Sequence, residues 1–462
     1  MNAQINKYID DHVSEMVTTL SKLVSIPSVK SKPAPGMPYG EECARVLDEM
    51  LKTADSFGFV TENHSNRVGT IDLYPALPPT LGVLCHLDVV PAGNGWKTPP
   101  FTLFMENGKL YGRGSTDDKG PAVCVLYALK AIRDLKIPLS QNVRFIVGTD
   151  EENGSSDLAW YKARHKLPPY VFTPDGSYPV INIEKGMIRG EISAFCKCEA
   201  EKTILNLNGG TVINAVPEKA TATVAGFSDI ELKLAAQNTG APSMFSFSVD
   251  GNKTVITSSG KSAHASTPAE GKNAITALCS LLGKLHTDDD TAKMFASLSH
   301  LFPFGETDGT SLKIKTSDET SGALTEVLSI INFNGSKLFG KFDIRFPVCT
   351  SCDKLRTKLE KAFLQKGFTL SDFSGSEPHM VDENSPFIKT LISVYEEATG
   401  ARGGCIAIGG GTYVHEIDGG VAFGAEFIGE DNHIHSAGEF MSIERMKQNA
   451  KIFAEAIIRI CK

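Results

Sequence analysis

The segment TLGVLCHLD, residues 80–88, is a short apolar run that ends at a histidine and an aspartate. Prolines precede the run and polar residues follow it, which is typical of a buried strand. A second run of this kind, NVRFIVG at 142–148, predicts another buried strand. Between them, the segment 120–136 (GPAVCVLYALKAIRDLK) predicts a helix with Pro121 in its first turn. Strand, helix and strand in this order indicate a parallel α/β unit.

The sequence on either side of this unit indicates where the domain begins and resumes. An amphipathic helix opens the chain, because apolar residues recur at helical spacing from Ile5 to Val24, and Pro27 ends the pattern. After the insertion described next, helices are predicted at 386–399 and 443–460. We therefore expect an α/β domain with a mixed, largely parallel sheet flanked by helices.

The pattern of apolar and polar residues changes in the stretch 186–384. It carries several β-like segments, among them Ala220–Val224, Phe245–Val249 and Lys341–Phe346. These segments predict an inserted α+β domain with two lobes. The α/β domain would then consist of 1–185 and 385–462.

The composition is that of a globular protein. The 462 residues are 41% hydrophobic and 22% charged, and the formal net charge is −8. A negative net charge disfavours nucleic acid and anionic membranes as partners. No apolar stretch approaches the roughly 20 residues of a membrane helix, and acidic residues near the N-terminus interrupt any signal-peptide core. We therefore expect a cytoplasmic protein that binds neither nucleic acid nor membranes.

The ten cysteines are scattered along the chain. In a reducing compartment such residues act as small buried hydrophobes. Two short spacings, Cys196/Cys198 and Cys349/Cys352, match those of a four-thiolate zinc site. They lie far apart in the sequence and the other features of a zinc ribbon are missing, so we disfavour that site.

Acidic residues and histidines follow the predicted strands at their carboxyl ends, where open α/β sheets bind ligands. His86 and Asp88 end the first strand; a carboxylate beside a metal-bound imidazole would fix its tautomer, although a plain turn explains the pair equally well. Runs of acidic residues also precede the predicted helix and follow the second strand. Helix capping or a solvated loop would explain these runs without a metal. These runs and the remaining candidates are Asp117-Asp118, Asp150-Glu151-Glu152, Asp175, His433 and His435.

Together these groups favour a metal centre over any single ordinary explanation. Three acids in a row repel each other, and a nearby dication would make the arrangement favourable. Oxygen and imidazole donors of this mix suit zinc, manganese or cobalt. Many carboxylates with few ligands per ion suggest two ions that share a bridging ligand. The residues alone leave open which aspartate, glutamate and histidine of each run binds.

The ordered motifs of the chain resemble those of the M20 metallopeptidase family, most closely its PepV-type bacterial dipeptidases. The resemblance spans nearly the whole chain. The matching runs are HLDVVPAGNGW (86–96), YGRGSTDDKGP (111–121), GTDEENG (148–154), TPDGSYP (173–179), GTVINAVPEKATA (210–222), GKSAHAS (260–266), FDIRFP (342–347), GGGTY (409–413) and HSAGE (435–439).

The resemblance implies a role for each residue of the metal centre. Asp117 would be the ligand that bridges two divalent metal ions, zinc foremost, with manganese or cobalt as alternatives. His86 and Asp175 would complete one metal site, and Glu152 and His435 the other. Glu151 would be the general base on the water between the metals, with Asp88 as the partner of His86. The family also has a cis peptide after the bridging aspartate, here Asp117–Asp118.

The resemblance also implies that the insert is a lid that binds the substrate. His264 would stabilise the oxyanion, while Asn214 and Arg345 would bind the substrate. Arg345 alternates with Phe342, Ile344 and Phe346 along its strand, which predicts that it lies exposed on the opposite face. Gly410 and Gly411 would present backbone amides to the substrate. Without the resemblance, a surface histidine, a surface salt bridge and a plain turn explain these positions.

The expected activity is that of a metal-dependent dipeptidase for short peptides with a free C-terminal carboxylate. The rival activities within the family are N-acyl-amino-acid deacylase, desuccinylase and carboxypeptidase, which would use the same metal centre. A non-catalytic metal-binding relative is disfavoured, because Glu151 and all the ligands are present. A lid as long as 186–384 resembles those that replace a partner subunit, so we expect a monomer.

Overall fold

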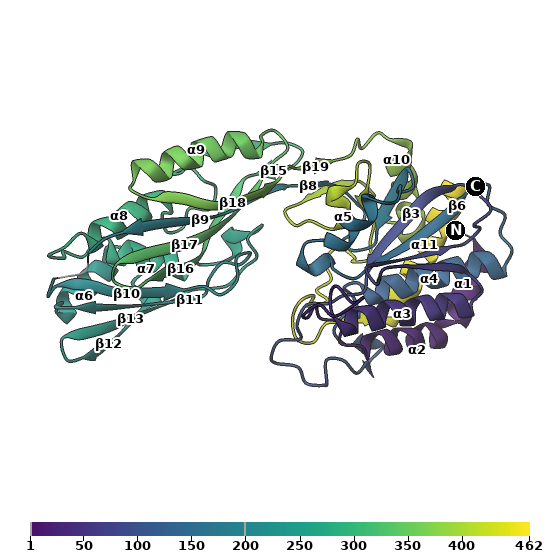
Figure 1. Ribbon diagram of the computed structural model, residues 1–462, viewed down its shortest axis with the longest axis horizontal. Helices are drawn as coiled ribbons and strands as arrows, with labels where there is room; N and C mark the ends of the chain where they lie inside the picture. The colour runs from purple at the N-terminus through teal and green to yellow at the C-terminus, as the bar shows by residue number, and fades with distance from the viewer. Residues whose placement is uncertain (1, 198–199) are drawn as a thin grey trace. The chain divides into compact units, whose positions relative to one another are not determined.

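The structure is a computed structural model that describes residues 2–197 and 200–462. Cys198, and with it the disfavoured four-thiolate site, lies outside the described residues. The chain forms two compact units (Figure 1). The first unit consists of Met1–Ile183, Met380–Ile406 and Gly411–Lys462, and the second of Glu184–His379 and Ala407–Gly410.

The short segment Ala407–Gly410 belongs to the second unit, although it lies outside the predicted insert 186–384. Two hydrogen bonds explain why. The backbone N–H of Lys185 donates to the carbonyl of Ile408 at 2.9 Å, and Nη1 of Arg345 donates to the carbonyl of Gly409 at 2.8 Å.

The first unit is built on a mixed nine-stranded sheet of order β1-β2-β6-β3-β7-β21-β8-β19, with β20 also paired to β8. The strands are β1 (Val60–His64), β2 (Val68–Asp72), β3 (Pro79–His86), β6 (Asn142–Gly148), β7 (Tyr170–Thr173), β8 (Val180–Glu184), β19 (His379–Met380), β20 (Cys405–Ile408) and β21 (Val421–Ala422). Strand β3 is parallel to both β6 and β7, and β21 is parallel to β7. The two predicted strands and the parallel unit are therefore confirmed.

Helices cover both faces of this sheet. The larger core includes residues of α1 (Ala3–Asp11), α2 (Val13–Val24), α3 (Glu41–Ser56), α4 (Lys119–Asp134), α10 (Pro386–Thr399) and α11 (Ile443–Cys461). A smaller core on the other face joins the sheet to α5 (Ser156–Lys162) and the 3-10 helix η4 (Tyr413–Glu416). A separate three-stranded sheet contains β4 (Phe104–Glu106), β5 (Lys109–Tyr111) and β22 (Phe440–Ser442). None of the described helices is long and apolar enough to cross a membrane.

The predicted N-terminal helix is divided into α1 and α2 at His12. The periodicity of apolar residues continues across the break, which is why the sequence predicts one helix. The ring of His12 stacks on Tyr8, and its Nδ1 lies 2.7 Å from the Tyr8 carbonyl oxygen. This local contact accompanies a backbone at His12 that departs from helical geometry, with φ −105° and ψ 10°.

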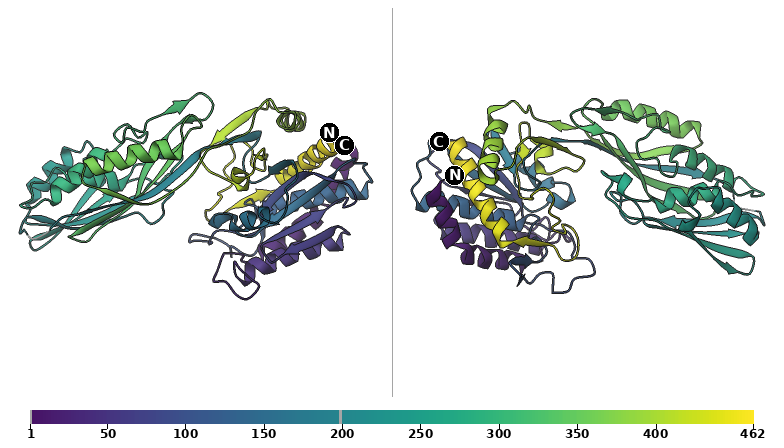
Figure 2. Two further views of the ribbon diagram at one scale, coloured as in Figure 1. Left: turned by 45° about the horizontal axis from the view of Figure 1, so that its top comes forward. Right: turned by 180° about the vertical axis from the view of Figure 1, so that it is seen from behind.

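The second unit has one continuous eight-stranded sheet of order β12-β13-β11-β10-β16-β17-β9-β18. Its strands are β9 (Gly186–Phe195), β10 (Thr203–Gly209), β11 (Lys219–Ala225), β12 (Phe245–Asp250), β13 (Lys253–Ser259), β16 (Thr325–Phe333), β17 (Lys337–Phe346) and β18 (Thr369–Ser376). A single core joins the sheet to α6 (Asp229–Gln237), α7 (Ala274–Leu282), α8 (Thr291–Leu301) and α9 (Cys352–Gln365). Figure 2 shows the helices of this unit along one face of its sheet. The α+β class is confirmed, while the division into two lobes stays a prediction.

Candidate metal centre and active site

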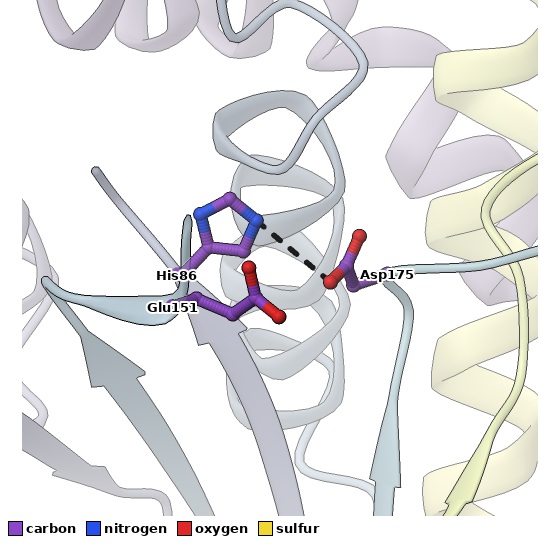
Figure 3. A group of neighbouring side chains, drawn as sticks. All are labelled: His86, Glu151 and Asp175. Carbon is purple, nitrogen blue, oxygen red and sulfur yellow. Dashed lines mark ion pairs between the residues drawn. The ribbon is translucent and has the colours of Figure 1, made fainter. Parts of the chain in front are cut away.

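Three parallel strands bring their carboxyl ends to one edge of the sheet in the first unit. His86 ends β3 and is paired with Gly148, the last residue of β6. Glu151 follows β6 in the short 3-10 helix η1 (Glu151–Asn153), and Asp175 lies two residues beyond the end of β7. In Figure 3 the side chains of His86, Glu151 and Asp175 point toward one another, with a dashed line for the 3.8 Å ion pair between His86 and Asp175.

Asp117 lies at the centre of this group. Its Oδ1 is 2.9 Å from Nε2 of His86, and its Oδ2 is 2.8 Å from Nε2 of His435. The same nitrogen of His435 is 3.1 Å from Oε1 of Glu152. Each oxygen of Asp117 therefore faces a different imidazole. The structure brings together all five predicted ligands, which we call the acid–imidazole cluster: His86, Asp117, Glu152, Asp175 and His435.

Asp118 and His433, the alternatives to Asp117 and His435 in the sequence, point elsewhere. Oδ2 of Asp118 accepts a hydrogen bond from the backbone N–H of His86 at 3.1 Å. The peptide bond between Asp117 and Asp118 is cis, as the resemblance implied. Nδ1 of His433 lies 3.7 Å from Oδ1 of Asp431, and the His433 ring lies near the ring of Phe440 rather than in the cluster. Tertiary packing thus separates Asp117 from Asp118 and His435 from His433, whereas Glu151 and Glu152 both lie within reach of His86.

Asp88 contacts the cluster in a different way from the one expected. The backbone carbonyl of Asp88, not its carboxylate, lies at hydrogen-bond distance from Nδ1 of His86, at 2.9 Å against 3.6 Å. The carboxylate instead accepts the backbone N–H groups of Glu151 and Glu152, at 3.1 and 3.2 Å. Asp88 therefore holds η1 at the end of β6, and with it the two glutamates.

Burial and nearby charges shift the pKa values of the acidic residues in and beside the cluster. Burial and the charge of Asp117 raise the pKa of Asp175 to about 7. Burial and the charge of Asp175 raise the pKa of Glu151 as well. For Asp117 the effect of burial is outweighed by hydrogen bonds with His435 and His86, which lower its pKa. The carboxylate form of Asp117 is thus stabilised by two imidazoles, whereas the carboxylate forms of Glu151 and Asp175 are destabilised by neighbouring negative charges.

These observations fit a site for divalent metal ions. The donors are imidazole nitrogens and carboxylate oxygens, which zinc, manganese and cobalt prefer. Two groups of three residues could each hold an ion, because the potential ligand atoms within each group lie within 4.8 Å of one another. One group is His86, Glu151 and Asp175, and the other is His86, Asp117 and Glu152. Added positive charge would relieve the crowding that raises the carboxyl pKa values.

Sequence reasoning missed a buried ion pair beneath Asp117. Nη1 of Arg113 donates to Oε2 of Glu439 at 2.5 Å, and both side chains are buried. Oε1 of Glu439 accepts the backbone N–H groups of Thr116 and Asp117, at 2.9 and 3.2 Å. Both residues occur in runs that carry the family resemblance, but their separation in the sequence hides the contact.

Tyr413 was also missed. It is buried against the other face of the cluster, with its ring edge-on to that of His86 at 6.3 Å between centroids. Its hydroxyl donates to Asp157, which also accepts the backbone N–H groups of Thr149 and Asp150 at the end of β6. The tyrosine therefore supports both a ligand and the loop that carries the glutamates.

In the second unit, the structure brings His264 and Asn214 side by side. Ala215 and His264 form an antiparallel bridge, and the N–H of Ala265 donates to the carbonyl of Asn214 at 2.9 Å. Both side chains are exposed. Nδ1 of His264 accepts the backbone N–H of Ser266 at 3.2 Å, so the proton of a neutral ring resides on Nε2.

Arg345 is buried, so the prediction of an exposed side chain is wrong. It is 5% exposed, and Asp343 on the same strand face accepts hydrogen bonds from its Nε at 2.6 Å and its Nη2 at 3.0 Å. Nη1 donates to the carbonyl of Gly409. The alternation along β17 is as predicted, since Phe342, Ile344 and Phe346 lie in the core on the other face. The opposite face is simply not open to solvent there.

The glycine run after β20 is only partly enclosed. Gly410 is half-buried and Gly411 is exposed. Gly409 packs so tightly on Ser266 that an added Cβ would lie 2.4 Å from the Cβ of Ser266. A side chain at Gly409 would therefore displace the loop that carries His264.

Comparison with known proteins agrees with the motifs. The family model described as peptidase family M20/M25/M40 matches residues 82–459. The chain is 33% identical over 436 residues to the "Putative dipeptidase YtjP" of Bacillus subtilis, covering 93% of both chains. It is 30% identical over 468 residues to the "Putative dipeptidase SH1171" of Staphylococcus haemolyticus, covering 98% of both.

Solved structures share the fold. Human carnosine dipeptidase 1 superposes with a TM-score of 0.57 at 20% identity, covering 99% of both chains. The dipeptidase Dug1p of Saccharomyces cerevisiae superposes with a TM-score of 0.59 at 15% identity, covering 99% of this chain and 98% of its own.

Replacing Glu439 by glutamine should weaken metal binding. The variant leaves Arg113 buried without a charged partner and weakens the hydrogen bonds from the N–H groups of Thr116 and Asp117, which hold Asp117 in place. We therefore expect the affinity for zinc to fall about 10- to 100-fold. Competition with a chromophoric chelator measures this. Glu106→Gln, an exposed glutamate of β4, is the matched control and should bind zinc as the parent does. Parental affinity in Glu439→Gln would refute the supporting role.

Proposed function

The chain belongs to peptidase family M20/M25/M40, and on that premise we propose that it is a dipeptidase that uses two divalent metal ions. The observation that carries the proposal is the position of Asp117, whose two oxygens face different imidazoles. A carboxylate placed in this way is suited to bridge two cations. The names of the two relatives support cleavage of dipeptides as the reaction.

In this proposal the ligands divide around Asp117. His86 and Asp175 hold one ion with it, and Glu152 and His435 hold the other. Zinc is the metal we favour, with manganese or cobalt as alternatives. When bound, the two ions supply a lowered pKa for an attacking water and polarisation of the scissile carbonyl.

Glu151 acts as the general base and then as the general acid. Its carboxyl lies beside His86 and Asp175, where burial and neighbouring negative charge raise its pKa and make it a stronger base. It accepts a proton from the attacking water and then donates that proton to the leaving amine nitrogen. Asp88 holds the backbone of Glu151 in place for both transfers.

The second unit supplies the groups that recognise the substrate. His264 donates from Nε2 to the oxyanion that forms at the scissile carbon. Nε, Nη1 and Nη2 of Arg345 each donate one hydrogen bond to the described residues, which leaves one N–H on each terminal nitrogen for the substrate carboxylate as far as those residues go. Asn214 and the backbone of Gly410 and Gly411 complete the set of proposed substrate contacts.

Glu151→Gln should keep its metal and lose turnover. Without the proton acceptor, kcat/KM should fall about 10²- to 10⁴-fold, while metal analysis should still find two ions per chain. Glu152→Gln is the matched contrast, because it removes a proposed ligand one residue away and should reduce metal content. If Glu151→Gln instead lost an ion, Glu151 would be a ligand of the kind that its triad with His86 and Asp175 also permits.

The zinc- or manganese-loaded protein should prefer free dipeptides to tripeptides and N-acyl amino acids. Amidation of the dipeptide carboxylate should lower kcat/KM about 10- to 100-fold, because the guanidinium of Arg345 loses a charged partner. In Arg345→Met the acid and the amide should be cleaved equally slowly. Faster hydrolysis of N-acyl amino acids would assign the protein to the deacylases of the family.

We also propose that the protein is a monomer, because the predicted insert 186–384 is as long as the lids that replace a partner subunit in the family that the motifs resemble. Light scattering coupled to gel filtration should give a mass near 49.7 kDa at every concentration tested. A stable dimer that persists on dilution would contradict this proposal.

A further inference from the structure

The second unit contains a cavity of about 240 Å³ that none of the proposed catalytic steps uses. It lies between β16, the segment 268–276 and the segment 302–307. Its size is slightly below the range of roughly 300–1,000 Å³ that is usual for small-molecule sites. Its walls include the aromatic rings of Phe302 and Phe304, the side chains of Val216 and Val327, and the carboxyl-bearing residues Glu306 and Glu326.

Glu326 is an unusual residue for this position. It lies on β16 paired with Ile344 of β17, and it is only 3% exposed. Among the described residues, none forms a hydrogen bond with its buried Oε2. Its backbone is held firmly, since its N–H donates to the carbonyl of Thr307 at 2.9 Å. A buried carboxyl oxygen without a hydrogen-bond partner destabilises a fold, which points to a role in binding.

Two acidic residues, Glu306 and Asp308, lie near enough to Glu326 to affect its pKa. Burial, followed by the charges of Glu306 and Asp308, raises its pKa well above the usual range. Both neighbours already have partners. Ser311 donates to both oxygens of Glu306, and Lys315 pairs with Asp308 at 2.6 Å. Glu326 is thus the lining carboxyl with a buried oxygen that has no partner among the described residues, while the exposed Lys272 places its own positive charge at the rim of the lining.

The walls favour an organic cation over a metal ion. Calcium takes six to eight oxygen ligands and magnesium demands a near-ideal octahedron, whereas the carboxyl groups that line this cavity are those of Glu306 and Glu326 alone. Phe302 and Phe304 suit an alkyl stem, and an aromatic face also attracts a cationic head. Thr276 and Thr307 offer further hydrogen-bonding groups.

We propose that this cavity binds a small organic cation, whose ammonium group pairs with Glu326 and whose alkyl part packs on Phe302 and Phe304. The site is independent of the proposed dipeptidase activity, because it shares no residue with the proposed substrate contacts. It nevertheless adjoins them. Val216 and Val327, which line the cavity, form a small hydrophobic cluster with Ala265, the residue after His264.

The test uses the metal-loaded full-length chain and n-butylammonium chloride as the probe. Titration calorimetry and thermal unfolding should show binding to the parent protein. Glu326→Gln should bind the probe about thirtyfold more weakly or worse, because the cation loses its buried partner. Glu270→Gln, which removes an exposed charge of the same unit beside the cavity-lining residues, is the matched control and should bind as the parent does.

Two further arms make the outcome decisive. 1-Butanol has the same stem without the charge and should not bind. Glu326→Met should unfold at the same temperature as the parent or a higher one, because it removes an unpaired buried carboxyl. The proposal is overturned if butylammonium fails to bind, if it binds Glu326→Gln as tightly as the parent, or if potassium or magnesium chloride alone produces the Glu326-dependent effect.

Discussion

Electrostatic repulsion among carboxylates at the carboxyl ends of β3, β6 and β7 is the constraint around which the first unit is organised. Parallel pairing places His86, η1 and the loop after β7 at one edge of the sheet. Acids so close together stay in place only if each is held by other groups. Backbone N–H groups do this for Asp88, Asp118 and Glu439, and two imidazoles do it for Asp117.

The support extends through several separate segments of the chain. Glu439, just before β22, reaches Arg113 in the loop before α4, and Tyr413 of η4 reaches Asp157 of α5. Each contact joins an element far along the chain to a loop that carries a ligand or the proposed base. The site therefore depends on the complete assembly of the first unit, including its C-terminal segments, and not on the first strand–helix–strand unit alone.

The second unit shows two different ways of burying charge. Arg345 and Asp343 are paired with each other, so the charge of each is compensated within β17. Glu326 on the adjacent strand has no such partner for its buried oxygen among the described residues. The first arrangement stabilises the strand that holds Gly409 beside the loop of His264, whereas the second leaves a buried carboxyl oxygen at the cavity for which we propose a cationic ligand.

The sequence by itself determined the fold class, the strands that carry the site and the order of the motifs, because hydrophobic periodicity and turn residues act locally. It also assigned the family through motifs that span the chain. It predicted one N-terminal helix where there are two and an exposed Arg345 where the side chain is buried. Only the tertiary structure decided these points, together with Asp117 facing both histidines, the Arg113–Glu439 pair and the buried Glu326 oxygen that has no partner in the described part of the chain. Such features depend on which distant segments meet, and the sequence pattern around each residue does not contain that information.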